Sequence, residues 1–192
     1  MLIHRLLIAV GLSAYTASCS SAPDPILYTL ADQNLPASSI TSDQIIGLSE
    51  LNLPAYARNQ QITTAVSPYR ISEDDNHRWA APPSEALTAA LSKALESSSS
   101  STVLQRPYPS GVRPNIRLSI TFDRLLRGVD GDAEMSGQYL IQSEERAAEI
   151  KRFSISIPSA DDDYEAYMSA LSRALAELGT QIAAELETDL AD

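Results

Sequence analysis

The chain has 192 residues, with 14 Lys or Arg against 25 Asp or Glu, so its formal net charge at pH 7 is −11. This acidic balance argues against nucleic-acid binding, because binding to phosphates depends on Lys and Arg that displace counterions. The length suits one domain with a core of its own.

The first 18 residues have the layout of a secretory signal peptide, which is removed from the mature protein. Arg5 precedes an uncharged apolar run at 6–17, which is too short for a spanning helix of about 20 residues. Cys19, the only cysteine, follows this leader, and Thr16-Ala17-Ser18-Cys19 resembles a lipobox, in which cleavage occurs just before a lipid-modified cysteine. Cys19 is therefore the candidate lipidation site.

An ordinary signal peptide cut near Ala17 or Ala22 is the alternative, and it would leave an unpaired thiol, which is unusual in an exported protein. Acyl chains on Cys19 would instead form a lasting anchor. Lipoproteins that stay in the inner membrane carry Asp after the cysteine, whereas this chain has Ser20, so we expect attachment to the periplasmic face of the outer membrane. The expected organisation is a signal peptide at 1–18, a lipidated cysteine and short tether at 19–24, and a single domain at 25–192.

The first part of the expected domain consists of short strands joined by turns. Apolar and β-branched runs predict strands at 25–30, 44–53, 62–66 and 69–72, with a loop at 31–43 and a stop at Pro54. The acidic run Glu73-Asp74-Asp75-Asn76 predicts a solvated hairpin tip, and a metal-binding loop there is the less favoured interpretation.

A helix is predicted to begin at Ser84, which follows two prolines and could cap the free amides. Its apolar residues fall on one face: Leu87, Leu91, Ala94 and Leu95. The five serines at 97–101 predict a flexible connector, because serine is a poor helix former and adds no apolar surface. After a strand around Val103, the prolines of 106–114 predict a loop.

The second part of the domain alternates strictly between apolar and polar residues over 116–123, which indicates a strand with one buried face. Asp130-Gly131 predicts a hairpin turn, followed by a strand at 133–141. A third strand should point Phe153, Ile155 and Ile157 inward. Three such segments joined by short turns predict an antiparallel meander.

A final helix is predicted at about 162–186, and its apolar residues form one stripe: Tyr164, Tyr167, Leu171, Ala174, Leu175, Leu178, Ile182 and Leu186. Asp161-Asp162-Asp163 suits the positive end of the helix dipole, so we interpret it as a cap rather than a metal site. The predicted fold class is α+β, a largely antiparallel sheet with two main helices packed on one face.

The sequence offers little for catalysis. His77 is the only histidine after the leader, and no nucleophile-elbow pattern accompanies it. Phosphate-binding glycine motifs and zinc-ligand sets are absent from the sequence as well. We therefore expect a protein that is not an enzyme and needs no cofactor or metal.

Two motifs resemble the PqiC-like family of ABC-type transport auxiliary lipoproteins: the run that starts at Gly47, contains the corner Leu53-Pro54-Ala55-Tyr56 and ends at Thr64, and the run Arg78-Trp79-Ala80-Ala81-Pro82. The resemblance continues through Phe122-Asp123 and the last helix. It departs from the family pattern at Ala57, Asn59 and Ala65.

The resemblance implies a periplasm-facing lipoprotein that assists a transporter with an MCE-type subunit, and it allows a homo-oligomer. Tyr56 and Trp79 are ordinarily core or corner anchors. The same corner, with Arg58 and Arg78 beside it, could instead bind the partner, because Tyr, Trp and Arg dominate binding hot spots.

The leading hypothesis is an outer-membrane tether and docking element of an MCE/ABC-type lipid transport system that links the inner and outer membranes. The alternatives are a periplasmic lipid carrier with an apolar pocket and a structural cell-envelope lipoprotein.

Overall fold

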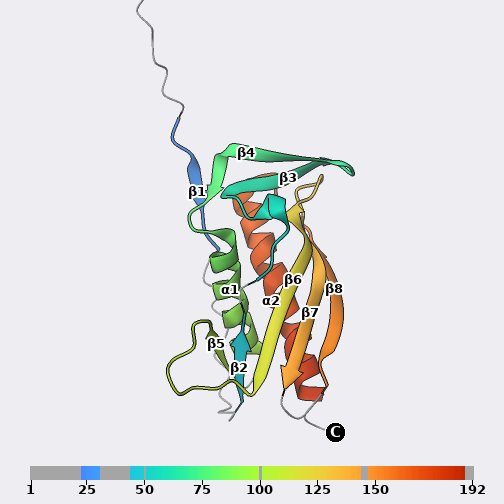
Figure 1. Ribbon diagram of the computed structural model, residues 1–192. Helices are drawn as coiled ribbons and strands as arrows, with labels where there is room; N and C mark the ends of the chain where they lie inside the picture. The colour runs from blue at the N-terminus through green and yellow to red at the C-terminus, as the bar shows by residue number, and fades with distance from the viewer. Residues whose placement is uncertain (1–22, 31–43, 50, 100, 144–146, 189–192) are drawn as a thin grey trace, which may run out of the picture.

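The computed structural model describes residues 23–30, 44–49, 51–99, 101–143 and 147–188, and the predicted signal peptide, Cys19 and the 31–43 loop lie outside these ranges. The elements in chain order are β1 (Ile26–Tyr28), β2 (Ile45–Leu48), the short 3-10 helix η1 (Ala55–Ala57), β3 (Gln61–Ser67), β4 (Arg70–Trp79), α1 (Pro83–Ser98), β5 (Thr102–Gln105), β6 (Ile116–Arg127), β7 (Ala133–Ser143), β8 (Glu149–Ile157) and α2 (Tyr164–Thr188). The eight strands form one sheet (Figure 1).

The antiparallel meander is confirmed in β6, β7 and β8. Residues from Ile116 to Phe122 alternate between the core and the outside, as predicted, until a bulge before Arg124 breaks the period. Gly137 faces Phe122 across the ladder, and a Cβ there would collide with the carbonyl of Thr121. Close backbone approach therefore requires glycine at this position.

Parallel pairings complete the sheet around this meander. β2 lies between β5 and β6 and runs parallel to both, while β1 runs parallel to β4. The predicted strand at 44–53 is shorter than expected, because β2 ends at Leu48 and Asn52 makes only an isolated bridge to Thr121. The sheet is thus mixed, although its three longest pairings are antiparallel.

The hairpin tip predicted at Glu73-Asp74-Asp75-Asn76 is wrong. β4 continues through these residues to Trp79, and the turn between β3 and β4 lies at Pro68 and Tyr69. The acidic side chains are tolerated within the strand because neighbours bind them: Asn59 donates to Glu73, and Gln61 donates to Asp75. A run of carboxylates on a solvated stretch of strand that pairs on one side only therefore needs no turn.

Two expectations about the first helix are also wrong. Pro82 is the N-cap of α1 and Pro83 its first residue, so Ser84 lies inside the helix and its carbonyl accepts a hydrogen bond from Thr88 Oγ1. The serine run does not form a connector from its start, because the helix continues to Ser98. Ser99 then caps it, buried, with Oγ donating to the Leu95 carbonyl at 2.7 Å.

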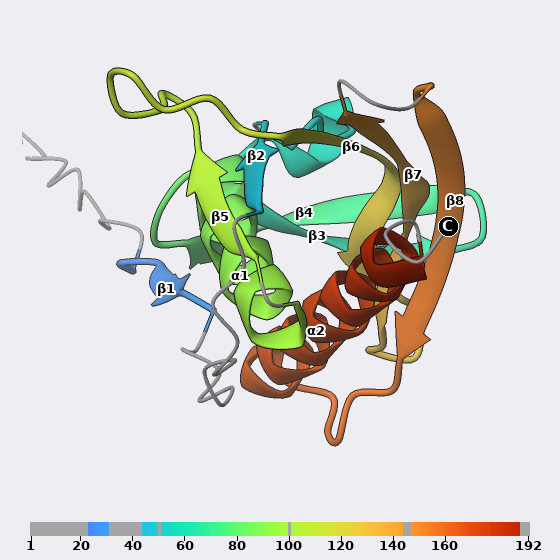
Figure 2. The same cartoon turned by 90° about the horizontal axis from the view of Figure 1, so that it is seen from below.

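Both main helices pack on one face of the sheet, which confirms the predicted α+β class. α2 crosses the concave side formed by β7 and β8, and α1 packs against α2 and β5 (Figures 1 and 2). Phe122 and Phe153 meet edge to face in the core, with ring centroids 5.4 Å apart. The predicted stripe of α2 is buried from Tyr167 to Leu186, while Tyr164 is half-buried at the helix start.

Candidate functional site

The four candidate binding residues come together where η1 meets the end of β4. The Trp79 amide donates to the Gln60 carbonyl at 2.7 Å, which fastens the last residue of β4 to the loop after η1. Gln61 then pairs with Arg78 in the ladder. The structure therefore forms a single corner from two segments that the sequence separates by about twenty residues.

The aromatic members of this corner lie on its inner side. Trp79 is 5% exposed and belongs to the core. Tyr56 is half-buried, and its hydroxyl accepts a hydrogen bond from the Leu125 amide at 3.3 Å, which links η1 to β6. Thr63 Oγ1 donates to the Tyr56 carbonyl at 3.0 Å. Large apolar area with a bonded polar tip is the typical role of anchoring aromatic residues.

The arginines form the outer side of the same corner. Arg58 is exposed, and its Nε donates to the Leu53 carbonyl at 2.9 Å. Arg78 is half-buried, and its Nε donates to the Asp75 carbonyl at 2.9 Å. Because each guanidinium is held by a backbone oxygen, both are pre-oriented, which reduces the entropy that a partner must overcome.

A second cluster, which the sequence analysis did not find, joins β1, β4 and α2. The ring of His77 stacks on Tyr164 with centroids 4.1 Å apart and on Tyr28 with centroids 5.6 Å apart. Tyr28 Oη and His77 Nδ1 are 2.8 Å apart. These three residues lie far apart in the chain and share no motif. The β1–β4 register brings Tyr28 to His77, and the packing of α2 brings Tyr164 to both.

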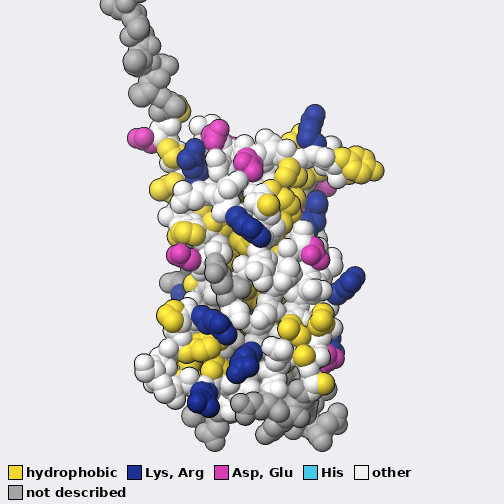
Figure 3. All heavy atoms as spheres, viewed as in Figure 1, with side chains coloured by type: hydrophobic (Ala, Val, Ile, Leu, Met, Phe, Trp, Pro, Cys, Tyr) yellow, Lys and Arg dark blue, Asp and Glu magenta, His cyan; other side chains and the backbone are white. Residues whose placement is uncertain are grey.

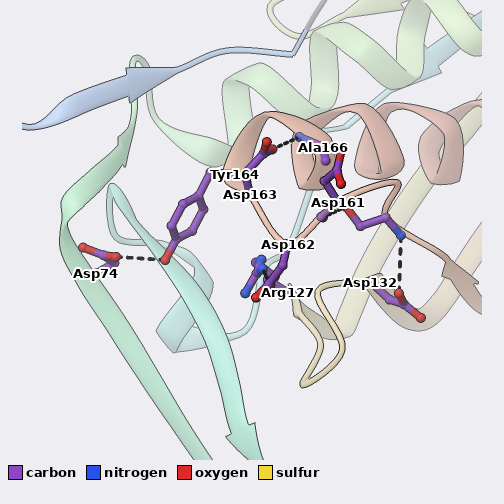
Figure 4. Close-up of polar contacts among 9 residues, drawn as sticks. Asp74, Arg127, Asp132, Asp161, Asp162, Asp163, Tyr164 and Ala166 are labelled. Carbon is purple, nitrogen blue, oxygen red and sulfur yellow. Dashed lines mark hydrogen bonds and ion pairs between the residues drawn. The ribbon is translucent and has the colours of Figure 1, made fainter.

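Asp74 connects this aromatic cluster to the start of α2 (Figure 4). Tyr164 Oη donates to Asp74 Oδ2 at 2.9 Å, and the Asn76 amide donates to Asp74 Oδ1 at 2.8 Å. Burial alone would raise the pKa of Asp74, but these hydrogen bonds favour the carboxylate and lower its pKa below the ordinary value. Burial raises the pKa of the Tyr164 hydroxyl.

Within the acidic triplet before α2, Asp163 makes the capping contact that was predicted for the triplet. Asp163 Oδ1 accepts the Ala166 amide at 2.6 Å (Figure 4). Asp162 forms an ion pair with Arg127, a buried residue whose guanidinium also lies 5.4 Å from the Tyr164 ring centroid. Over the described residues, no group of three or more His, Cys, Asp and Glu side chains is arranged to hold a metal ion.

An open groove of about 600 Å³ lies between α1 and the segment that follows β5. Its lining mixes polar and apolar groups, because Glu85, Thr88, Gln105 and Arg106 contribute to it beside Leu48 and Ala89. An acyl chain along this open groove would take the charged groups of Glu85 and Arg106 out of water, which opposes lipid binding there.

Comparison with known protein families identifies the family of the chain. The sequence model for the ABC-type transport auxiliary lipoprotein component matches residues 28–183, which is most of the chain. The chain belongs to this family. Members of this family are auxiliary lipoproteins of ABC-type transport systems, and as lipoproteins they are anchored to a membrane of the cell envelope. This agrees with the resemblance found in the sequence.

Solved structures support the same fold. An uncharacterized protein is 19% identical, with a TM-score of 0.72 over 85% of this chain and 99% of its own. A protein of Xanthomonas campestris from the family DUF330 is 16% identical, with a TM-score of 0.69 over 87% of this chain and 100% of its own. Comparison with curated proteins gave no significant match.

In this auxiliary lipoprotein, the described part of the chain has no helix that combines the length and the apolar character needed to cross a bilayer. Cys19, the candidate lipidation site, lies outside the described residues. The first described strand, β1, follows it by a few residues.

Proposed function

We propose that this protein is an outer-membrane lipoprotein, anchored through Cys19, that acts as a non-enzymatic tether and docking element of an MCE/ABC-type lipid transport system linking the inner and outer membranes. The observation that carries the proposal is the family match over residues 28–183. The lipobox-like leader supplies the anchor, and the folded domain supplies a surface for an envelope-spanning partner.

The environment of His77 supports a role outside catalysis. Its ring forms a three-membered cluster with Tyr28 and Tyr164, with Nδ1 against the Tyr28 hydroxyl, so the side chain links three elements. A general base needs a substrate within hydrogen-bond reach, whereas Nδ1 of His77 lies against the Tyr28 hydroxyl and the Tyr164 ring stacks on the imidazole.

The openness of the groove and its charged residues support a tether over a lipid carrier. A carrier encloses apolar cargo in a pocket lined mainly by apolar side chains, whereas the groove beside α1 is open and carries Glu85 and Arg106. Native mass spectrometry of the unlipidated chain tests this point. Copurified phospholipid bound at one copy per protein would favour the carrier.

The docking face that we propose is the corner of Tyr56, Arg58, Arg78 and Trp79. The guanidiniums of Arg58 and Arg78 form its outer side and are held by the carbonyls of Leu53 and Asp75, while Tyr56 and Trp79 lie on its inner side. The partner is the MCE-type subunit, and the proposal allows several copies of this lipoprotein to dock together.

Crosslinking in cells tests the partner. With a photoreactive residue at position 58, we expect capture of an MCE-type subunit, and recovery of only cell-wall enzymes would refute the transport role. Arg58→Ala combined with Arg78→Ala should weaken capture from a second crosslinking position, while Arg113→Ala, an exposed arginine in the loop after β5, should not. Equal capture by all variants would exclude this corner as the docking site.

Cell fractionation tests the anchor. Cys19→Ala should leave a folded protein that is found in the soluble fraction. An unchanged membrane location would overturn the assignment of Cys19.

A further inference from the structure

Exposed large apolar side chains gather at one end of the molecule. Seven such residues occur in the described ranges, and six belong to β1, the β3–β4 hairpin or the turn after β6: Ile26, Leu27, Val66, Tyr69, Ile71 and Val129. The seventh is Ile150 of β8, which pairs with Leu140 of β7. This pair lies near the end of the meander that is opposite to the turn after β6. Scattered apolar residues are ordinary on a surface, but this concentration at one end is not.

The β3–β4 hairpin projects from this end as an arm (Figure 1). Its last pairing with the rest of the sheet is Thr64 with Arg127, and beyond that point the two strands pair only with each other in the described ladder. A two-stranded ribbon is marginally stable alone in water. An arm of this kind therefore gains from a surface that covers it.

The arm tip, residues 66–71, has the chemistry of a membrane interface. Tyr69 is fully exposed, and Val66 and Ile71 are 43% and 42% exposed beside it. Arg70 follows Tyr69 at the turn. An apolar group is visible at the projecting tip in Figure 3, with a cationic side chain near it. Tyrosine is favoured where one end of a side chain is apolar and the other wet, and arginine can pair with phosphate.

The position of β1 indicates that this end of the molecule faces the membrane. β1 pairs with the end of β4 through Ile26–His77 and Tyr28–Trp79, so the chain that leads back to Cys19 leaves the fold beside the base of the β3–β4 hairpin. Six residues separate Cys19 from Ile26, a reach of at most about 25 Å when extended. An acyl-anchored protein with so short a tether holds this end next to the bilayer.

The acidic residues of β4 do not prevent this contact. Glu73 accepts a hydrogen bond from Asn59, and Asp75 pairs with Gln61 and Arg78, all toward the base of the arm. The tip itself carries the cationic Arg70. Phosphate headgroups therefore meet one cation and an aromatic ring before they meet a carboxylate.

We propose that the arm tip inserts into the headgroup region of the phospholipid bilayer and acts as a second membrane contact beside the acyl anchor. This inference rests on the membrane attachment in the proposed function but not on the MCE partner. It orients the domain, because two separate contacts fix its tilt relative to the membrane where one flexible tether would not.

Vesicle binding by the mature chain 19–192 carrying Cys19→Ala tests the proposal without the apolar leader and without the acyl anchor. The probe is a vesicle of phosphatidylethanolamine and phosphatidylglycerol at a ratio of about 3:1, as a stand-in for a bacterial phospholipid leaflet with modest anionic charge. We expect measurable cosedimentation and a loss of about tenfold in partition coefficient for Tyr69→Ser combined with Ile71→Ser, equivalent to about 1.4 kcal/mol. The control is Ile150→Ser, which removes an apolar side chain that is 62% exposed near the other end of the meander and should change nothing.

A site-specific measurement checks the geometry. An environment-sensitive fluorophore on Tyr69→Cys, in the Cys19→Ala background, should shift to the blue and be quenched by spin-labelled lipid, while the same label on Ile150→Cys should not. Two results would overturn the proposal. One is no vesicle binding by the parent chain, and the other is vesicle binding by the tip variant (Tyr69→Ser with Ile71→Ser) that equals binding by the parent chain. If the tip variant binds vesicles normally but fails to capture a protein partner in cells, the arm is a protein-docking element instead. Failure to capture an MCE subunit would leave the vesicle result unaffected, so the two proposals fail separately.

Discussion

Replacing Tyr164 by Phe isolates one hydrogen bond that joins the β3–β4 hairpin to α2. The Tyr164 hydroxyl donates to the Asp74 carboxylate at 2.9 Å, and nothing else in the ring changes. Hydrogen bonds to charged groups contribute about 1.5–3 kcal/mol, and the partial exposure of this pair reduces the expected loss to about 1 kcal/mol. A loss of that size lowers the melting temperature by about 2–4 °C in a protein of this length.

The effect should depend on pH in a definite direction. The folded protein lowers the pKa of Asp74 below its ordinary value of 3.8, so the resulting stabilisation is complete above that value and is lost as the pH falls through the lower folded pKa. In Tyr164→Phe the folded pKa of Asp74 moves back toward 3.8. The difference in unfolding free energy between the two proteins should therefore narrow as the pH falls from 4 toward 3.

Urea unfolding followed by Trp79 fluorescence measures this difference, because Trp79 is the only tryptophan and is buried. The matched control is Tyr69→Phe, which removes the same hydroxyl from a fully exposed ring and should have no effect at any pH. A difference between Tyr164→Phe and the parent that stays constant from pH 7 to pH 3 would refute the role of the Asp74 carboxylate. An equal loss in the control would refute the hydrogen-bond assignment.

Three further substitutions test the packing and the cap. Trp79→Ala should reduce the unfolding free energy by about 3–5 kcal/mol in chemical denaturation followed by circular dichroism, because it opens a cavity under the corner, and a loss below about 1 kcal/mol would show that the ring is not a core anchor. Gly137→Ala should lower the melting temperature by several degrees, since its methyl group meets the backbone of the facing strand, and an unchanged melting curve would contradict that close approach. Asp163→Ala should destabilise by about 1 kcal/mol through loss of the cap on Ala166, while Asp161→Ala should not, and equal effects in thermal unfolding would refute the assignment of the cap to Asp163.

The meander and α2 could be predicted because their patterns are local. Alternation over residues 116–122 specifies which face is buried whatever the neighbouring strands are, and the stripe from Tyr167 to Leu186 does the same for a helix. The cap at Asp163 follows from helix-end chemistry alone.

The parallel pairings and the length of β4 could not be predicted in the same way. β2 is a short buried strand between β5 and β6, and its few apolar residues do not indicate partners or direction. The polar run at Glu73-Asp74-Asp75-Asn76 is typical of a turn, but bonds from Asn59, Gln61 and Tyr164 keep it in the strand. These donors come from other segments, so no local window contains them.

The candidate corner could likewise be predicted only in part. The sequence indicates that Tyr56 and Trp79 are anchors, and their burial agrees with it, but the contact between the end of β4 and the loop after η1 depends on the hairpin register. The contact of His77 with Tyr28 depends on the β1–β4 register in addition. Residues brought together by register alone leave no spacing signal in a single sequence.

The pairing of β1 with β4 also determines how the fold responds to mechanical force. The two strands are parallel, so a pull along the axis of β1 from its N-terminal side loads all three residue pairs in shear, together with the contact between Tyr28 and His77. From there the load passes through the end of β4 into the corner at Trp79 and on to α1, rather than into the meander. β1 is therefore the first element expected to yield under such a pull. The force needed to detach this short strand and its Tyr28 contact from β4 sets the load that the membrane-anchored domain withstands before it begins to unfold.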